Sequence, residues 1–419
     1  ATWCGGGGIT GSASVVYTGG PWVGLITFAA PPIGIILLYF IAGKVRKSNK
    51  VTVPEIMGAR YGKAASIIAA LCVMLAYVGV LATQLKAAAD IIVLLCASSG
   101  IEISHGLALT ICTALIAIIT VGGGLVSVAY SDAISALLMI GGFFLAIPFL
   151  IGVANSQGAT LPPEKMTITG GMSGWELLGY FLPSLALMLG DQNMLQRFAS
   201  AKNSDEAKKS NIGMFIGEIL VIISIVLVVT QAAKLYPTLD VPSNVIFQVA
   251  VDYLPLAFGA LVMCACMAFI VTTADSYLLV SVQTCVHDIG KTIRPQMPER
   301  TEISLSRIFS IVLPLGALVI ALYIHNAYNI LMFAWSFYAA SAGIPAFAAL
   351  FWKKATKTGV MAGLLGGFVV CVGWKLAGQP FGLGAAVPGT VACGIALVVV
   401  SLATYKRAPS VFLKAEKQS

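Results

Sequence analysis

Residues 1–20 read ATWCGGGGITGSASVVYTGG, an apolar stretch with four consecutive glycines. Each glycine weakens a helix by about 1 kcal/mol relative to alanine. In a bilayer that weakness is costly, because every backbone N–H and C=O there needs a partner within the protein. A helix that unwinds at Gly5, Gly6, Gly7 and Gly8 would expose carbonyl oxygens able to bind a cation. We therefore expect a broken helix here, the alternative being close packing of helices through small residues.

The composition places the whole chain in a membrane. Of its 419 residues, 58% are hydrophobic and 10% are charged, whereas soluble domains carry about 25% charged residues. The nine cysteines form no CxxC pair and show no spacing typical of a metal site. No HExxH motif, paired histidines or Ser/His constellation appears, so we do not expect an enzyme.

A spanning helix needs about 20 apolar residues, and a window of this length finds twelve candidate segments. They are 1–19, 21–43, 63–97, 104–122, 124–154, 174–200, 211–233, 255–288, 303–324, 328–352, 358–377 and 387–405. None of them alternates in polarity as a strand would. The sequence therefore predicts an all-α membrane protein with about twelve transmembrane helices.

The net charge of +8 comes from separate basic loops and not from a single patch. Most Lys and Arg residues follow the segments that end at 43, 200, 288 and 352, or lie in the tail after 405. Such loops stay in the cytoplasm, so we expect a multi-pass protein of the plasma membrane with a cytoplasmic C-terminus. The charge thus predicts topology and gives no reason to expect a nucleic-acid partner.

Residues 1–155 and 174–352 can be read as two halves of five helices each, followed by two further helices and a cytoplasmic tail in 353–419. An odd number of helices per half inverts one half relative to the other. The first helix of each half is interrupted, by the four glycines in one and by LGDQNMLQR (189–197) in the other. Interrupted helices at matching positions indicate a transporter site near the middle of the bilayer.

Segment 255–288 carries Thr272, Thr273, Asp275 and Ser276 within about 1.4 helical turns. A single Ser or Thr in a membrane helix usually bonds the carbonyl four residues earlier. Three hydroxyls with a carboxylate favour a cation site instead, because hard cations prefer oxygen ligands.

Ionisable side chains inside a membrane indicate function, and each needs a partner. Lys86 and Asp90 are spaced to pair with each other. Asp132 has no local partner and needs a cation from elsewhere, either a residue or an ion. Asp191 lies at the expected break, whereas Glu218 is close enough to the cytoplasmic end of its segment to reach water.

Four motifs carry a resemblance to the sodium/solute symporter family, which transports sugars, proline, pantothenate, sialate or choline. They are VTVPEIMGARYG (51–62), GGGLVSVAYSDAIS (122–135), QRFASAKN (196–203) and TTADSYLLVSVQTCVHDI (272–289). The resemblance covers essentially the whole chain and implies a leucine-transporter-type fold, an inverted five-plus-five repeat with further C-terminal helices. Residues 1–20 are most similar to the first core helix of the choline branch. Because family members carry an extra helix before it, the resemblance also implies an N-terminally truncated chain.

The resemblance implies a main sodium site between the broken first helix and segment 255–288. Its ligands would be the carbonyls of Ala1, Cys4 and Phe269 and the hydroxyls of Thr272 and Thr273. Some members have a second sodium site, which corresponds here to Asp132, Thr272, Asp275 and Ser276. Sodium would be the coupling ion, and no organic cofactor is expected.

Family solute sites lie among the first, second, third, sixth, seventh and tenth segments. The candidate residues here are Trp3, Gly8, Gln84, Lys86, Asp191, Asn193, Trp335 and Tyr338. For the aromatic residues, core packing is the alternative. The choline branch has an aromatic residue near the position of Asp191. An acid there suits an ammonium group when combined with Trp3, Lys86 suits a carboxylate, and the two charges together suit a zwitterion.

The sequence thus predicts a sodium-coupled symporter that takes up a small organic solute, in the class of amino acids, quaternary amines or carboxylates, by alternating access. One alternative is a proton-coupled carrier of the same fold that uses Asp132 or Asp275. Another is a membrane sensor, which would need an output domain after the last segment. The expected partners are the solute and the lipid bilayer.

Overall fold

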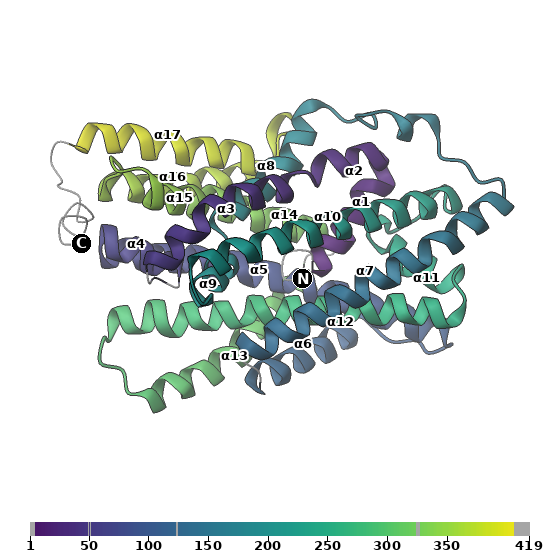
Figure 1. The fold of residues 1–419 in the computed structure, drawn as a ribbon, viewed down its shortest axis with the longest axis horizontal. Helices are drawn as coiled ribbons and strands as arrows, with labels where there is room; N and C mark the ends of the chain where they lie inside the picture. The colour runs from purple at the N-terminus through teal and green to yellow at the C-terminus, as the bar shows by residue number, and fades with distance from the viewer. Residues whose placement is uncertain (1–4, 49, 51, 123–124, 324–326, 406–419) are drawn as a thin grey trace.

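The computed structural model describes residues 5–48, 50, 52–122, 125–323 and 327–405. In this part of the chain the protein is a bundle of α-helices, most of which run roughly along one direction (Figure 1), and no strand forms. Ten helical stretches among the described residues are long and apolar enough to cross a membrane. The all-α membrane class predicted from the sequence is confirmed.

The helices follow the predicted segments closely. They are α1 (Gly6–Gly19), α2 (Pro21–Thr27), α3 (Ala30–Ser48), α4 (Val53–Tyr61), α5 (Lys63–Ser98), α6 (His105–Gly122), α7 (Leu125–Ser156), α8 (Gly174–Gly190), α9 (Gln192–Ser200), α10 (Ser204–Leu235), α11 (Val245–Asp252), α12 (Leu256–Gln283), α13 (Glu299–Tyr323), α14 (Ala327–Tyr338), α15 (Ile344–Phe351), α16 (Lys357–Leu376) and α17 (Ala386–Thr404). Two stretches are π-helical. The first, η3 (Thr284–Lys291), continues α12, and the second, η4 (Ala339–Gly343), joins α14 to α15. Three 3₁₀ turns, η1 (Pro163–Met166), η2 (Pro242–Asn244) and η5 (Pro380–Gly382), lie between helices.

Several predicted segments consist of more than one helix. Segment 174–200 is divided into α8 and α9, and segment 328–352 contains η4 between α14 and α15. The ten long apolar stretches do not include α1 or α8, which have 14 and 17 residues. These are the first helices of the two predicted halves, and α8 ends where the chain leaves the helix at Asp191.

The structure corrects the expected unwinding at the four glycines. α1 begins at Gly6, with Gly5 as its N-cap, so Gly6, Gly7 and Gly8 form the first helical turn. A Cβ on Gly5, Gly6 or Gly7 would lie less than 3.0 Å from Thr273, Ala87 or Leu331, respectively. In the described residues the glycines therefore permit close packing of helices, which was the alternative to a broken helix. Any unwound stretch would precede Gly5, and residues 1–4 lie outside the described residues.

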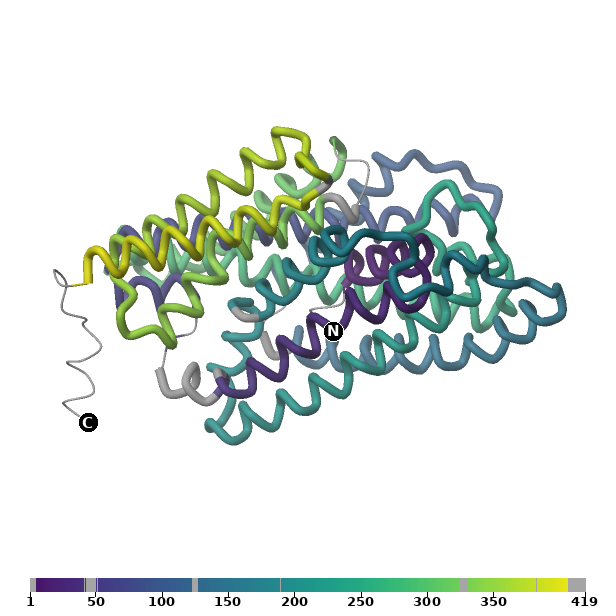
Figure 2. The backbone as a smooth tube through the Cα atoms, turned by 90° about the horizontal axis from the view of Figure 1, so that it is seen from above, coloured from purple at the N-terminus to yellow at the C-terminus, as the bar shows by residue number. Residues whose placement is uncertain are grey.

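α1 lies inside the bundle, where it contacts α5, α10, α12 and α14. At one edge of the bundle α16 and α17 lie side by side, as Figure 2 shows in yellow-green and yellow. Both helices pack against η4. A Cβ on Gly367 of α16 would overlap the carbonyl oxygen of Ala340 in η4 and lie 2.8 Å from Cys393 Cβ of α17. The glycine therefore sets the distance between the two C-terminal helices and the π-helical stretch.

Gly367→Ala should lower the thermal unfolding midpoint by several degrees, because overpacking of a tight core costs about 1–3 kcal/mol. The matched control is Gly373→Ala in the same helix, where an added Cβ meets no described atom within 4 Å. The control should be neutral or slightly stabilising, since alanine favours a helix. Unfolding of the purified protein in detergent measures both, and equal midpoints would contradict the packing argument.

Candidate functional site

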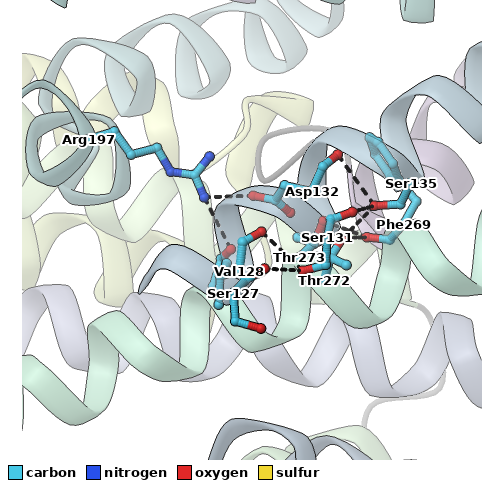
Figure 3. A network of polar contacts seen from close by, with 10 residues as sticks. Ser127, Val128, Ser131, Asp132, Ser135, Arg197, Phe269, Thr272 and Thr273 are labelled. Carbon is cyan, nitrogen blue, oxygen red and sulfur yellow. Dashed lines mark hydrogen bonds and ion pairs between the residues drawn. The ribbon is translucent and has the colours of Figure 1, made fainter. Parts of the chain in front are cut away.

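The N-terminus of α1 lies against the middle of α12. A Cβ on Gly5 would collide with the side chain of Thr273, so the two backbones approach this closely only because position 5 is glycine. Thr273 Oγ1 donates a hydrogen bond to the Phe269 carbonyl at 2.8 Å, and Thr272 Oγ1 donates to the same carbonyl at 3.2 Å. Figure 3 shows these three residues together on α12. The structure thus groups the oxygens that α12 was expected to offer to sodium beside the start of α1, while Ala1 and Cys4 lie outside the described residues.

Gln84 of α5 is 1% exposed and reaches the first turn of α1. Its Oε1 accepts a hydrogen bond from the Gly6 N–H, and its Nε2 donates to Thr83 Oγ1 at 3.2 Å. The first N–H groups of a helix have no partner within the helix, so Gln84 satisfies one of them. This residue, expected near the solute, therefore lies at the contact between α1 and α12. Trp3, another solute candidate, is outside the described residues.

α8 ends at Gly190 and α9 begins at Gln192, with Asp191 between them at φ −60° and ψ 116°. The interruption predicted within 189–197 is confirmed. Asp191 is 1% exposed, and its Oδ1 accepts hydrogen bonds from the Tyr77 hydroxyl and from the Asn193 N–H, the latter at 3.3 Å. The Tyr77 hydroxyl also accepts from the Gln192 N–H at 2.9 Å. One tyrosine of α5 thus bonds to both residues at the start of α9.

Tyr338 of α14 pairs with the backbone carbonyl just before the break. Its hydroxyl donates to the Gly190 carbonyl at 2.5 Å, and its ring stacks on Tyr77 with 5.6 Å between centroids. The π-helical η4 follows directly, and a Cβ on Gly190 would lie 2.9 Å from Gly343 Cα within it. Such π-helical stretches frequently occur at functional sites. Tyr338, a solute candidate, uses its hydroxyl to support the helix break.

In the described part of the chain, three polar atoms at the break have no hydrogen-bond partner. They are Asp191 Oδ2, Gln192 Oε1 and Asn193 Nδ2, in residues that are at most 2% exposed. A buried polar group without a partner costs about 1–3 kcal/mol, and functional sites are a common reason for retaining one. The break is therefore the candidate site at which a carboxylate oxygen, an amide oxygen and an amide N–H await partners.

Gly8 and Trp335, two more solute candidates, line one small cavity enclosed by α1, α2, α8 and α14. Its other lining residues are Gly7, Ser12, Thr27, Phe28, Tyr180, Ser184, Leu331 and Met332. Its volume of about 10 Å³ leaves room for about one water molecule, so in this conformation it does not hold an organic solute. The structure brings Gly8 and Trp335 together as expected, although Asp191 and Asn193 do not line this cavity.

Lys86 does not lie beside Asp191. Its Nζ is 3.7 Å from Asp90 Oδ1 and 3.2 Å from His105 Nε2, and that nitrogen is 2.6 Å from Asp90 Oδ1. The pairing of Lys86 with Asp90 is confirmed, and His105 completes a cluster of three that the spacing within one helix could not reveal. On α5, Lys86 follows Tyr77 by nine residues, which is about 13 Å along a helix. The structure therefore does not support Lys86 and Asp191 as the two ends of a zwitterion site.

The cationic partner of Asp132, which lies on α7, is an arginine side chain of the protein. Arg197 Nη2 lies 2.7 Å from Asp132 Oδ2 and 3.3 Å from Ser276 Oγ. Figure 3 shows the Arg197 side chain extending from α9 toward Asp132. The sequence predicted only that Asp132 needs a cation, because Arg197 lies 65 residues away in the chain and no local pattern joins the two.

The other two residues of the expected second sodium site also have partners. Thr272 Oγ1 lies 3.2 Å from Ser135 Oγ of α7. Asp275 Oδ1 accepts a hydrogen bond from Thr120 Oγ1 of α6 at 2.5 Å. The four candidate ligands are thus divided between an arginine, a serine and a threonine from three neighbouring helices.

The model of the sodium:solute symporter family matches residues 1–367 of this chain. The chain belongs to the sodium:solute symporter family. It is 27% identical over 319 residues to the high-affinity proline transporter PutP of Bacillus subtilis, covering 72% of this chain and 66% of that protein. It is 25% identical over 411 residues to a sodium/proline symporter of Haemophilus influenzae, covering 90% and 81%. A high-affinity choline transporter of Drosophila melanogaster is 25% identical over 353 residues, covering 79% and 55%.

Solved structures of transporters share the fold of this chain. A Na⁺-coupled sialic acid symporter in a substrate-bound outward-open state superposes with a TM-score of 0.72 at 15% identity, covering 98% of this chain and 90% of that one. Mhp1, a nucleobase-cation-symport-1 family transporter in a closed conformation, has a TM-score of 0.61 at 12% identity, covering 95% and 89%. The predicted leucine-transporter-type fold is confirmed. Family and relatives together support sodium-coupled solute transport by a multi-pass membrane protein.

Tyr77→Phe should lower both the thermal midpoint and the solute transport of this protein. The change keeps the stacked ring but leaves the Asp191 carboxylate and the Gln192 N–H without their shared hydroxyl, and a hydrogen bond to a charged group contributes about 1.5–3 kcal/mol. Tyr130→Phe on α7 is the control, because Tyr130 is 71% exposed. If both variants unfolded at the wild-type temperature, Tyr77 would not support the break.

Proposed function

We propose that this protein takes up a small amino acid or a similarly small amine together with sodium by alternating access. The observation that carries the proposal is the break at Asp191, where a buried carboxylate oxygen, the Gln192 amide oxygen and the Asn193 amide nitrogen have no hydrogen-bond partner in the described part of the chain. A carboxylate in a membrane helix favours a cationic group on the solute. Two of the relatives are proline transporters by name, and proline carries such an ammonium group.

The proposed sodium site lies at the contact between α1 and α12. Phe269 offers its carbonyl, and Thr272 and Thr273 offer hydroxyls within 3.2 Å of that carbonyl. These are hard oxygen ligands of the kind that alkali cations prefer. The remaining ligands of this proposal, the carbonyls of Ala1 and Cys4, precede the described start of α1.

Coupling in this proposal follows from the position of α1. Its first turn contacts α12 through Gly5 and α5 through Gln84, while Gly7 and Gly8 line the cavity with Trp335. A sodium ion and a solute on opposite sides of one short helix would each favour the conformation that the other binds. The halves 1–155 and 174–352 are proposed as the two inverted repeats, with 353–419 outside them.

Thr273→Ala should raise the sodium concentration for half-maximal uptake about tenfold, the equivalent of one lost ligand at about 1.4 kcal/mol. The measurement is uptake of radiolabelled L-proline into proteoliposomes over a sodium series at constant ionic strength. Thr113→Ala on α6 is matched, because Thr113 is also buried and bonds the carbonyl four residues earlier. An unchanged sodium dependence in the Thr273 variant would count against the site, and uptake that needs only a pH gradient would favour proton coupling.

A thermal-shift screen with and without sodium tests the solute class. L-Proline, choline and a small dicarboxylate represent the three classes, and a ligand at 100 times its Kd stabilises the folded state by about 2.7 kcal/mol. We expect L-proline to raise the midpoint only when sodium is present. A shift with the dicarboxylate alone would contradict the role of Asp191.

A further inference from the structure

We propose that Arg197 takes the place of a second sodium ion in this protein. Its guanidinium contacts Asp132 and Ser276, two of the four residues that a second ion would need, at 2.7 and 3.3 Å. The chain then binds one sodium ion, at the α1–α12 contact. This inference rests on the proposed sodium-coupled function.

Electrostatics make the arginine and a second ion mutually exclusive. Two unit positive charges about 4 Å apart in a protein environment repel strongly enough to weaken binding of the second by about 10²–10³-fold. An arginine is charged at every physiological pH. As long as Arg197 contacts Asp132, that carboxylate is already neutralised and a sodium ion gains little from approaching it.

The rest of the expected ligand set fits the same conclusion. Thr272 bonds Ser135 and the Phe269 carbonyl, and the latter belongs to the main site. Asp275 bonds Thr120 on α6. The oxygens that would surround a second ion are therefore directed to three different neighbours, and Arg197 is the group that occupies the position between Asp132 and Ser276.

Arg197 lies on a different helix from the residues that it contacts, and a cavity lies beside it. It is carried by α9, whereas Asp132 and Ser276 are carried by α7 and α12. Arg197 and Asp132 line a cavity of about 410 Å³ between these helices and α10, and Glu218 of α10 lines the same cavity. Glu218 is 8% exposed, and this cavity is the open space beside it. The guanidinium thus has space beside it and a second carboxylate in the same cavity.

The test is the number of sodium ions bound at equilibrium, measured with ²²Na⁺ alone on the purified full chain in detergent. The wild type should bind one ion. Arg197→Gln should bind two, and its sodium-induced thermal shift should become cooperative with a Hill coefficient approaching two. Arg197→Lys should stay at one ion because it keeps the charge. A purely structural ion pair would lower stability in the glutamine variant and leave the count at one, which would overturn the inference.

Asp132→Asn provides a second test that does not depend on the folding of Arg197→Gln. Because Arg197 and not sodium contacts Asp132, this variant should still bind one ion. A wild type that binds two ions and an Asp132→Asn variant that binds one would overturn the inference while leaving sodium coupling intact. A wild type that binds no ²²Na⁺ would instead refute the proposed function itself.

Discussion

The structure depends on satisfying the backbone where two membrane helices end inside the bundle. In lipid an unpaired N–H or carbonyl costs several kcal/mol, so a helix break survives only where side chains complete it. At the break between α8 and α9, the Tyr77 hydroxyl bonds the Gln192 N–H and Asp191, and the Tyr338 hydroxyl bonds the Gly190 carbonyl. At the start of α1, Gln84 accepts from the Gly6 N–H.

Tyr77 and Gln84 are seven residues apart on α5, which is about two turns. Residues at this spacing lie on the same face of a helix. One face of α5, a single continuous helix of 36 residues, therefore supports both helix ends. In the proposed function, the register of this face fixes the positions of the sodium and solute sites relative to each other.

The sequence predicted most of this architecture, because long apolar segments and breaks leave strong local patterns. The interruption at Asp191 could be read from polar residues within an apolar run. The sequence could not predict whether Gly6, Gly7 and Gly8 are helical or unwound, because glycine permits both unwinding and close packing. Only the neighbours decide between them, and here Ala87 and Leu331 lie too close for any side chain.

Partners in other helices were the other feature that local patterns could not reveal. Lys86 and Asp90 were predicted to pair because they share a helix, whereas His105 joins them from the next helix. Asp132 was known to need a cation, but Arg197 looked like one of many basic residues near a cytoplasmic loop. A positive side chain has the same local signature whether it directs topology or neutralises a buried acid.

The two ends of α9 connect the features described above. Asp191 caps its N-terminus, and Arg197 lies six residues further on, about 9 Å along the helix. A solute that engages Asp191 therefore acts on the same rigid helix whose other end bonds Asp132 and Ser276. Because coupling between two sites is reciprocal, the strength of the Arg197–Asp132 contact and the affinity for solute must depend on each other whenever α9 moves as a unit. In the proposed function, the ion pair that neutralises Asp132 would thereby contribute to the free energy of solute binding.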